Sequence, residues 1–182
     1  LGDAVAQIGS PTVLAVTATA SDDVANLIRT SLSIESTVLD PTVRENLLVE
    51  DKRGHGDKDA YLCALAARGE KAVIYVNSRD KSVQIARLLR KRVPESAMRT
   101  AFYNGGLSRS VRHAVESAFR DGDLRFVVAT SAFGEGVNIP DIRHVVLYHL
   151  PFNAVEFNQM AGRAGRDGAA SRIHLLFGEK DA

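Results

Sequence analysis

The feature that most constrains the fold is the alternation of short apolar runs with helical patterns of apolar residues. Runs such as Ala72–Val76, Leu124–Val128 and His144–Tyr148 are almost entirely apolar, which is typical of strands that are buried on both faces. Between them, apolar residues recur at helical spacing, as in the helix predicted over Asp80–Arg92. This alternation predicts an α/β fold with a mainly parallel sheet covered by helices on both faces.

The rest of the chain continues this pattern. Further helices are predicted to start after Ser21, over Lys58–Arg68, from Ser108 to a closing Gly122, and over Ala154–Ala161. Further strands are predicted over Thr12–Thr17, Arg99–Tyr103 and Ser171–Phe177, with two extended segments between Ile34 and Glu50. The run Thr12–Thr17 is expected to be a buried strand.

Composition excludes some classes of protein and leaves others open. The chain has 23 Lys and Arg against 22 Asp and Glu, so a basic surface for nucleic acid must come from local clustering. The sequence lacks the apolar run of about 18 residues that a membrane span needs, and we expect no membrane partner. With Cys63 as its one cysteine, it forms no intrachain disulfide, which suits a reducing, cytoplasmic location. The five histidines show no metal-ligand spacing, so no metal site is predicted.

The strongest chemical signal is the segment Gln159–Gly168, which reads Gln-Met-Ala-Gly-Arg-Ala-Gly-Arg-Asp-Gly. Arg163 and Arg166 stand three residues apart, and the flanking glycines allow close approach to the backbone. The planar fork of arginine and its permanent charge suit a phosphoryl group. Taken alone, the segment is equally compatible with a glycine-rich turn that carries solvated arginines.

A second signal, Ala129–Pro140, directly follows an apolar run. Ligands of open α/β sheets bind at the carboxyl ends of strands, and this segment brings hydroxyl groups, glycines and the amide of Asn138 to such a position. Taken alone, it would be a structural turn after a strand.

Together, in this order and with a predicted strand between them, the two segments resemble a known family. The stretch Val127–Gly168 resembles motifs five and six of superfamily-two helicases, and the RecQ subgroup most of all. Asn-x-Pro in the first segment and Gln-x-x-Gly-Arg-Ala-Gly-Arg-Asp-Gly in the second carry the likeness. Val73–Arg79 resembles motif four, Tyr103–Leu107 the turn that follows it, and Thr17–Ala20 motif three. One departure is Met160, where the RecQ pattern usually has an acidic residue.

The resemblance implies a three-layer α/β/α RecA-like lobe of the P-loop NTPase type, which supplies arginines to ATP held by a companion lobe. Arg163 and Arg166, with Gln159 beside them, are then the catalytic residues, and Arg166 is the arginine finger. Asn138, Glu135 and Gly136 resemble nucleotide-binding positions. The positions that resemble nucleic-acid contacts are Thr130, Ser131, Asn77, Ser78, Arg79, Asn104 and Gly105. ATP and Mg²⁺ would be held mainly by lobe one, and the partner would be single-stranded or partly duplex DNA in repair or recombination.

The resemblance also divides the chain. Residues 1–33 are expected to be the tail end of lobe one, an orphan strand and helix, and residues 34–182 to be lobe two. Without its sheet, the run Thr12–Thr17 would expose an apolar edge, so we expect it to be displaced, swapped onto a neighbour or poorly ordered. The sequence contains no Gly-x-x-x-x-Gly-Lys-Ser/Thr loop and no acidic box, so we expect it to be a piece of a longer protein that does not hydrolyse ATP alone. Two alternatives stay open at this point: a non-catalytic nucleic-acid-binding module within a larger nuclease or repair protein, and a lobe of an RNA helicase.

Overall fold

A computed structural model describes the whole chain except residues 1, 18–19, 41–42, 135–137 and 179–182. The chain forms two compact units, Leu1–Val43 and Arg44–Ala182. The sequence-based division after residue 33 stays a prediction.

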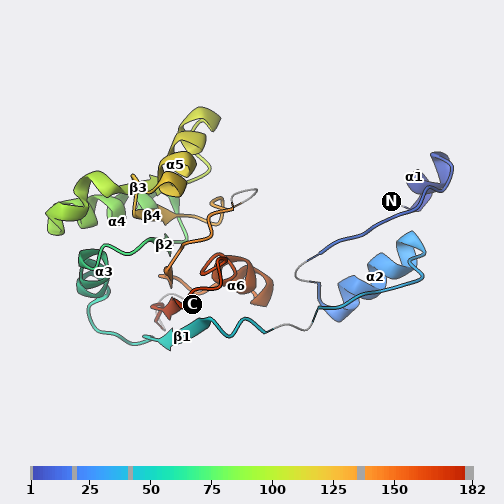
Figure 1. Ribbon diagram of the computed structural model, residues 1–182, viewed down its shortest axis with the longest axis horizontal. Helices are drawn as coiled ribbons and strands as arrows, with labels where there is room; N and C mark the ends of the chain where they lie inside the picture. The colour runs from blue at the N-terminus through green and yellow to red at the C-terminus, as the bar shows by residue number, and fades with distance from the viewer. Residues whose placement is uncertain (1, 18–19, 41–42, 135–137, 179–182) are drawn as a thin grey trace. The chain divides into compact units, whose positions relative to one another are not determined.

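The first unit contains two helices, α1 (Gly2–Gln7) and α2 (Asp22–Leu32) (Figure 1). The side chain of Ser21 accepts a hydrogen bond from the backbone N–H of Val24, as predicted for the start of α2. The buried strand that the apolar run Thr12–Thr17 favours is not formed, and its exposure agrees with what is expected of this run without its sheet. Leu14 and Val16 are 86% and 84% exposed, because the described part of this unit contains no strand with which they can pair. Ala18 and Thr19, within the motif-three likeness, lie outside the described residues.

The second unit is built on a six-stranded, wholly parallel sheet in the order β1-β6-β5-β2-β4-β3. The strands are β1 (Leu47–Asp51), β2 (Ala72–Tyr75), β3 (Thr100–Tyr103), β4 (Phe126–Ala129), β5 (His144–Leu147) and β6 (Ser171–Leu175). Of the two extended segments predicted between residues 34 and 50, only the second becomes a strand, because it pairs with β6.

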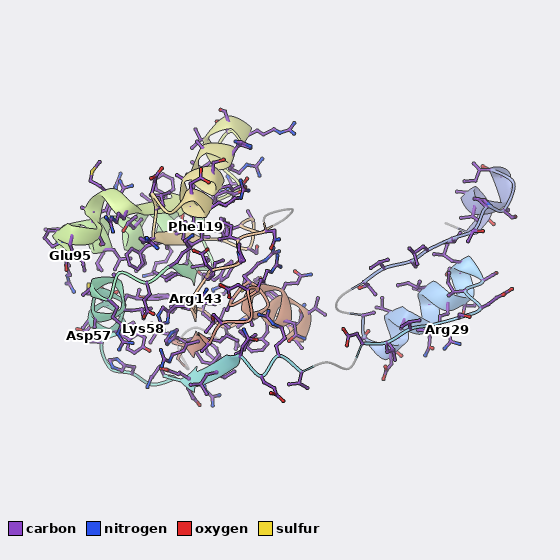
Figure 2. All side chains as sticks on the ribbon, viewed as in Figure 1. Arg29, Asp57, Lys58, Glu95, Phe119 and Arg143 are labelled. Atoms are coloured by element: carbon purple, nitrogen blue, oxygen red, sulfur yellow. The ribbon has the colours of Figure 1, made fainter. Side chains whose placement is uncertain are left out.

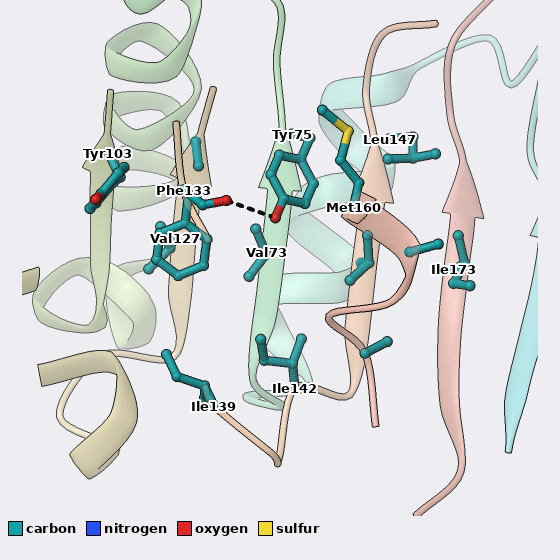
Figure 3. Close-up of a cluster of buried hydrophobic side chains, with 14 of the residues drawn as sticks. Val73, Tyr75, Tyr103, Val127, Phe133, Ile139, Ile142, Leu147, Met160 and Ile173 are labelled. Carbon is teal, nitrogen blue, oxygen red and sulfur yellow. Dashed lines mark hydrogen bonds between the residues drawn. The ribbon is translucent and has the colours of Figure 1, made fainter. Parts of the chain in front are cut away.

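Helices cover both faces of this sheet and confirm the three-layer α/β/α prediction. They are α3 (Lys58–Ala67), α4 (Arg79–Arg92), the 3₁₀ helix η1 (Pro94–Arg99), α5 (Arg109–Asp121) and α6 (Ala154–Ala161). Met160 of α6 packs with Tyr75 and its neighbours on one face (Figure 3), and Phe119 of α5 belongs to the same cluster. Leu62 of α3 and Leu89 of α4 pack on the other face. None of the helices among the described residues is both long and apolar enough to cross a membrane.

The connection between β4 and β5 contains no helix among its described residues, and it determines where the candidate site lies. It leaves the carboxyl end of β4 at Thr130, whose N–H donates to the carbonyl of Tyr103. It reaches the amino end of β5 at Arg143, whose N–H donates to the carbonyl of Lys71, just before β2. The connecting segment 130–143 therefore runs from the carboxyl edge of the sheet to its amino edge.

Candidate functional site

The turn that carries the two arginines, residues 162–168, follows α6 and lies at the amino edge of the sheet. The N–H of Gly165 donates to the carbonyl of Ile142 at 2.8 Å, and the N–H of Asp167 donates to the carbonyl of Pro140 at 3.2 Å. Gly165 has φ +51°, and a Cβ there would lie 2.5 Å from the Oγ of Ser171, so only glycine fits. The two segments singled out in the sequence are thus one structural unit.

Arg44 and Asn46, just before β1, hold this turn from the side of the sheet edge. The guanidinium of Arg44 donates to the carbonyls of Gly162, Ala164 and Gly165 at 3.2, 2.6 and 2.5 Å. The amide of Asn46 donates to the carbonyl of Gly165 at 2.8 Å. The carbonyls of the turn therefore point toward Arg44 and Asn46.

The guanidinium of Arg166 makes its described hydrogen bonds to neutral acceptors. Its Nη1 donates to the Oδ1 of Asn138 and its Nε to the carbonyl of Gly162, both at 3.2 Å. Burial, followed by the positive charges of Arg163 and Arg44, lowers the pKa of Arg166. Guanidinium groups stay charged far above neutral pH, so Arg166 remains a cation whose described hydrogen bonds leave its charge uncancelled.

Arg163 lies against the other end of the connecting segment. A Cβ added to Gly134, which has φ +119°, would lie 2.6 Å from the Cζ of Arg163. The buried hydroxyl of Tyr75 donates to the carbonyl of Phe133 at 3.3 Å (Figure 3). Burial raises the pKa of Tyr75, while the charges of Arg163 and Arg166 act in the opposite direction. Gly134 is therefore the position that gives Arg163 its room.

Asp167, the acidic residue that follows Arg166, is paired with Arg143, which directly precedes β5 and is labelled in Figure 2. Nη1 of Arg143 donates to Oδ1 of Asp167 at 3.0 Å, and to Oγ of Ser171 at 3.1 Å. Hydrogen bonding to Arg143 lowers the pKa of Asp167. This pair ties the end of the turn to the sheet. Among the described ion pairs, Asp167 pairs with Arg143 and not with Arg166.

Gln159 and Met160, adjacent in the sequence, face different surroundings. Met160 is 3% exposed and packs in the core with Tyr75. The residue that departs from the RecQ pattern is therefore a buried apolar side chain. Gln159 is exposed and lines a surface hollow together with Ser131. The structure thus places Gln159 on the side of the predicted nucleic-acid contacts.

Those predicted contacts gather at the opposite edge of the sheet, where β2, β4 and β3 are neighbours. Asn77, Ser78 and Arg79 follow β2, Asn104 and Gly105 follow β3, and Thr130 and Ser131 follow β4. The guanidinium of Arg79 extends beside the glycine turn, since a Cβ at Gly105 would lie 3.8 Å from its Nη2. The structure brings together in one area residues that the sequence spreads over about 55 positions, from 77 to 131.

Two of these side chains also have roles within the fold. The Oγ of Ser78 accepts a hydrogen bond from the N–H of Lys81 at 3.1 Å and so caps α4. Asn104 is 5% exposed. It donates to the Oγ of Ser82 at 3.0 Å and accepts from the N–H of Gly106 at 2.9 Å, so its side chain shapes the turn around Gly105.

Some predicted residues are not described, and some important ones were not predicted. Glu135 and Gly136 lie outside the described residues. Arg44, Asn46 and Arg143 were not predicted, because no local motif marks them. The one signal available for Arg44 and Asn46 was their position directly before an apolar run that becomes a strand.

Two buried histidines form a hydrogen-bonded chain away from the arginines. The hydroxyl of Tyr61 lies 2.7 Å from Nδ1 of His174, and Nε2 of His174 lies 2.9 Å from Nδ1 of His144. Nε2 of His144 lies 3.0 Å from a carboxylate oxygen of Glu70. If both rings are neutral, Tyr61 donates to His174, His174 donates to His144, and His144 donates to the carboxylate, where the chain ends. Burial lowers the pKa of His174 to about 4, which favours the neutral form of that ring.

Comparison with known proteins agrees with this geometry. Residues 57–168 match the family described as the helicase conserved C-terminal domain. The chain is 35% identical to the ATP-dependent DNA helicase RecQ of Bacillus subtilis over 94% of its own length and 29% of that protein. It is 33% identical to the probable ATP-dependent DNA helicase RecS of Bacillus subtilis, over 97% of the chain and 36% of that protein. The chain thus spans only about a third of the length of these relatives.

The fold also has solved relatives. S. cerevisiae Dbp5 bound to RNA and ADP BeF3 superposes with a TM-score of 0.69, over 88% of this chain and 44% of that chain, at 21% identity. At this identity the likeness concerns the fold, which is that of a RecA-like helicase lobe.

Proposed function

Because the chain belongs to the helicase conserved C-terminal domain family, we propose that it is the second motor lobe of a RecQ-like, ATP-dependent DNA helicase. The observation that carries the proposal is the contact between Asn138 and Arg166, which joins the two helicase-like segments into one site. The relatives that are named DNA helicases support the choice of activity and substrate.

In this proposal, Arg166 and Arg163 reach the γ-phosphoryl group of ATP held by lobe one, and Mg²⁺ is bound by lobe one as well. The transferred phosphoryl group carries its charge on equatorial oxygens, and arginine donates two parallel hydrogen bonds to such oxygens. The amide of Asn138 holds Arg166 without neutralising it. An arginine supplied in this way is worth about 10³–10⁵ in rate, or roughly 4–7 kcal/mol of barrier.

The carboxyl edge of β2, β4 and β3 is the proposed binding face for the DNA strand. Arg79, Gly105, Thr130 and Ser131 offer a cation, an exposed backbone and hydroxyl groups, which suit phosphates and carry no sequence information. Asn104 acts as a positioning residue, because its side chain is committed to the turn.

The connecting segment 130–143 supports a route for coupling between the two sites. One end follows β4 among the proposed strand contacts, and the other holds the arginine turn through Pro140 and Ile142. A shift of the segment would therefore change both sites together. Gln159 lines the hollow beside Ser131 and is placed to respond to the same shift.

The test uses the complete protein, which includes the companion lobe. We expect ATP hydrolysis to be slow alone and strongly stimulated by single-stranded DNA, and a partly duplex DNA to be unwound. Stimulation by RNA alone would refute the DNA assignment. Binding of single-stranded DNA without any ATP hydrolysis would refute the motor and favour a binding module.

A further inference from the structure

An open surface hollow of about 430 Å³ lies beside the proposed strand contacts. Ser131 forms one side of it, and Phe152, Asn153, Glu156 and Gln159 form the other. Among the described residues that line it, the one charged side chain is an acid, Glu156, so this part of the hollow does not favour a phosphate.

The most unusual member of this lining is Phe152, whose side chain is 88% exposed. Its backbone position is nevertheless fixed. The N–H of Phe152 donates to Oε2 of Glu156 at 2.7 Å, and the N–H of Glu156 donates to Oδ1 of Asn153, the cap of α6, at 2.8 Å. The backbone that carries this ring is thus held at the capped start of α6, and the ring itself is exposed to solvent, where a ligand can reach it.

A second hollow, of about 300 Å³, borders the same loop residue, Ala132. Arg109 and Arg112 line it. Its acid, Glu116, accepts a hydrogen bond from the hydroxyl of Tyr103 at 2.5 Å. The hollow lined by Arg109 and Arg112 and the hollow lined by Phe152 therefore both border Ala132. This arrangement suits a single strand of nucleic acid, because its phosphates bind to cations and its bases stack on aromatic rings.

We propose that Phe152 is a base-stacking residue: one unpaired nucleobase of the bound strand lies in this hollow against the ring, and its phosphates lie toward Arg109 and Arg112. Asn153, Glu156 and Gln159 line the hollow. Because Oδ1 of Asn153 and Oε2 of Glu156 already accept hydrogen bonds from the backbone, the amide of Gln159 is the proposed hydrogen-bonding partner for the edge of the base. Since a paired base is already stacked and covered, the hollow selects single-stranded nucleic acid. This inference rests on the proposed function, because it requires a strand at this edge of the sheet.

The experiment measures binding of the chain to a short oligothymidylate and to an abasic strand of the same length, by fluorescence anisotropy over a series of salt concentrations. We expect the wild-type chain to bind the oligothymidylate at least about five-fold more tightly than the abasic strand, the lower end for one stacked base. Phe152→Ala should abolish this preference and leave the salt dependence unchanged, because no phosphate contact is lost. Phe152→Tyr should keep the preference, and Phe152→Leu should not.

Met98→Ala is the matched control, since Met98 is an apolar side chain that is 91% exposed on η1, and it should bind as the wild type does. Equal binding of both strands by the wild-type chain, with Arg79→Ala lowering the salt dependence, would overturn the stacking role and leave the proposed function standing. An unchanged preference in Phe152→Ala would overturn it as well. Binding of neither strand would refute this inference together with the strand contacts of the proposed function.

Discussion

Replacing Arg44 by alanine tests whether the arginine turn is held from outside its own motif. Arg44 is half-buried and donates to three carbonyls of the turn, those of Gly162, Ala164 and Gly165. Two of these carbonyls keep a second side-chain donor after the substitution. Among the described hydrogen bonds, only the carbonyl of Ala164 is left without any side-chain donor.

The expected cost follows from that count. A hydrogen bond to a charged donor contributes about 1.5–3 kcal/mol to stability, and the two retained donors limit the loss to about one such bond. Arg44→Ala should therefore lower the free energy of unfolding by about 1.5–3 kcal/mol. Arg44→Lys should recover only part of this loss, because an ammonium group does not have the planar fork that spans three carbonyls.

Urea unfolding of the chain, followed by circular dichroism, measures the loss. Arg53→Ala is the matched control, because Arg53 is an exposed arginine that pairs only with Asp51 among its described ion pairs, and its removal should have no measurable effect. A loss below about 0.5 kcal/mol for Arg44→Ala would show that the turn does not depend on Arg44.

Further predictions concern the glycines of the turn and the buried histidines. Gly165→Ala should destabilise the chain by roughly 2–4 kcal/mol and Gly168→Ala by only about 1–2 kcal/mol. Both have positive φ, but only at Gly165 would a Cβ meet other atoms within 4 Å; equal losses in urea unfolding would contradict the contact. His174 has a folded pKa of about 4, below its ordinary 6.5, so in this range the folded state binds fewer protons than the unfolded state. The free energy of unfolding should therefore fall by about 2–3 kcal/mol in all as the pH drops from about 6.5 toward 4. Unfolding measured at several pH values should show a weaker dependence in His174→Gln but not in His113→Gln, and identical slopes would disprove the assignment.

The fold was largely predictable from the sequence because its signals are local. The apolar runs around Val73, Val127 and Val145 became three of the four interior strands, β2, β4 and β5. Ser108 and Gly122 bounded α5 as expected. The run Thr12–Thr17 has the same composition but forms no strand. A strand needs a hydrogen-bonding neighbour, and the composition of a segment does not show whether one is present.

The candidate site was predictable only where a short motif marks its residues. Arg163, Arg166 and Asn138 were singled out because they lie in two recognisable segments, and the structure adds the contact between Arg166 and Asn138. Arg44 reaches the same turn from about 120 positions away in the sequence, and this contact depends on the pairing of β1 with β6. Phe152 was missed for another reason. An aromatic residue in an apolar neighbourhood is usually part of the core, and only the structure shows it exposed.

The most direct test of the proposed motor is the ATPase activity of the complete protein carrying Arg166→Ala, measured with and without single-stranded DNA. The expected result is loss of DNA-stimulated hydrolysis, by about 10³-fold or more, with ATP binding within a few-fold of the wild type. Arg120→Ala, an exposed arginine on α5 outside the site, should hydrolyse ATP normally. Normal DNA-stimulated turnover in Arg166→Ala would contradict the assignment of this arginine to the phosphoryl group.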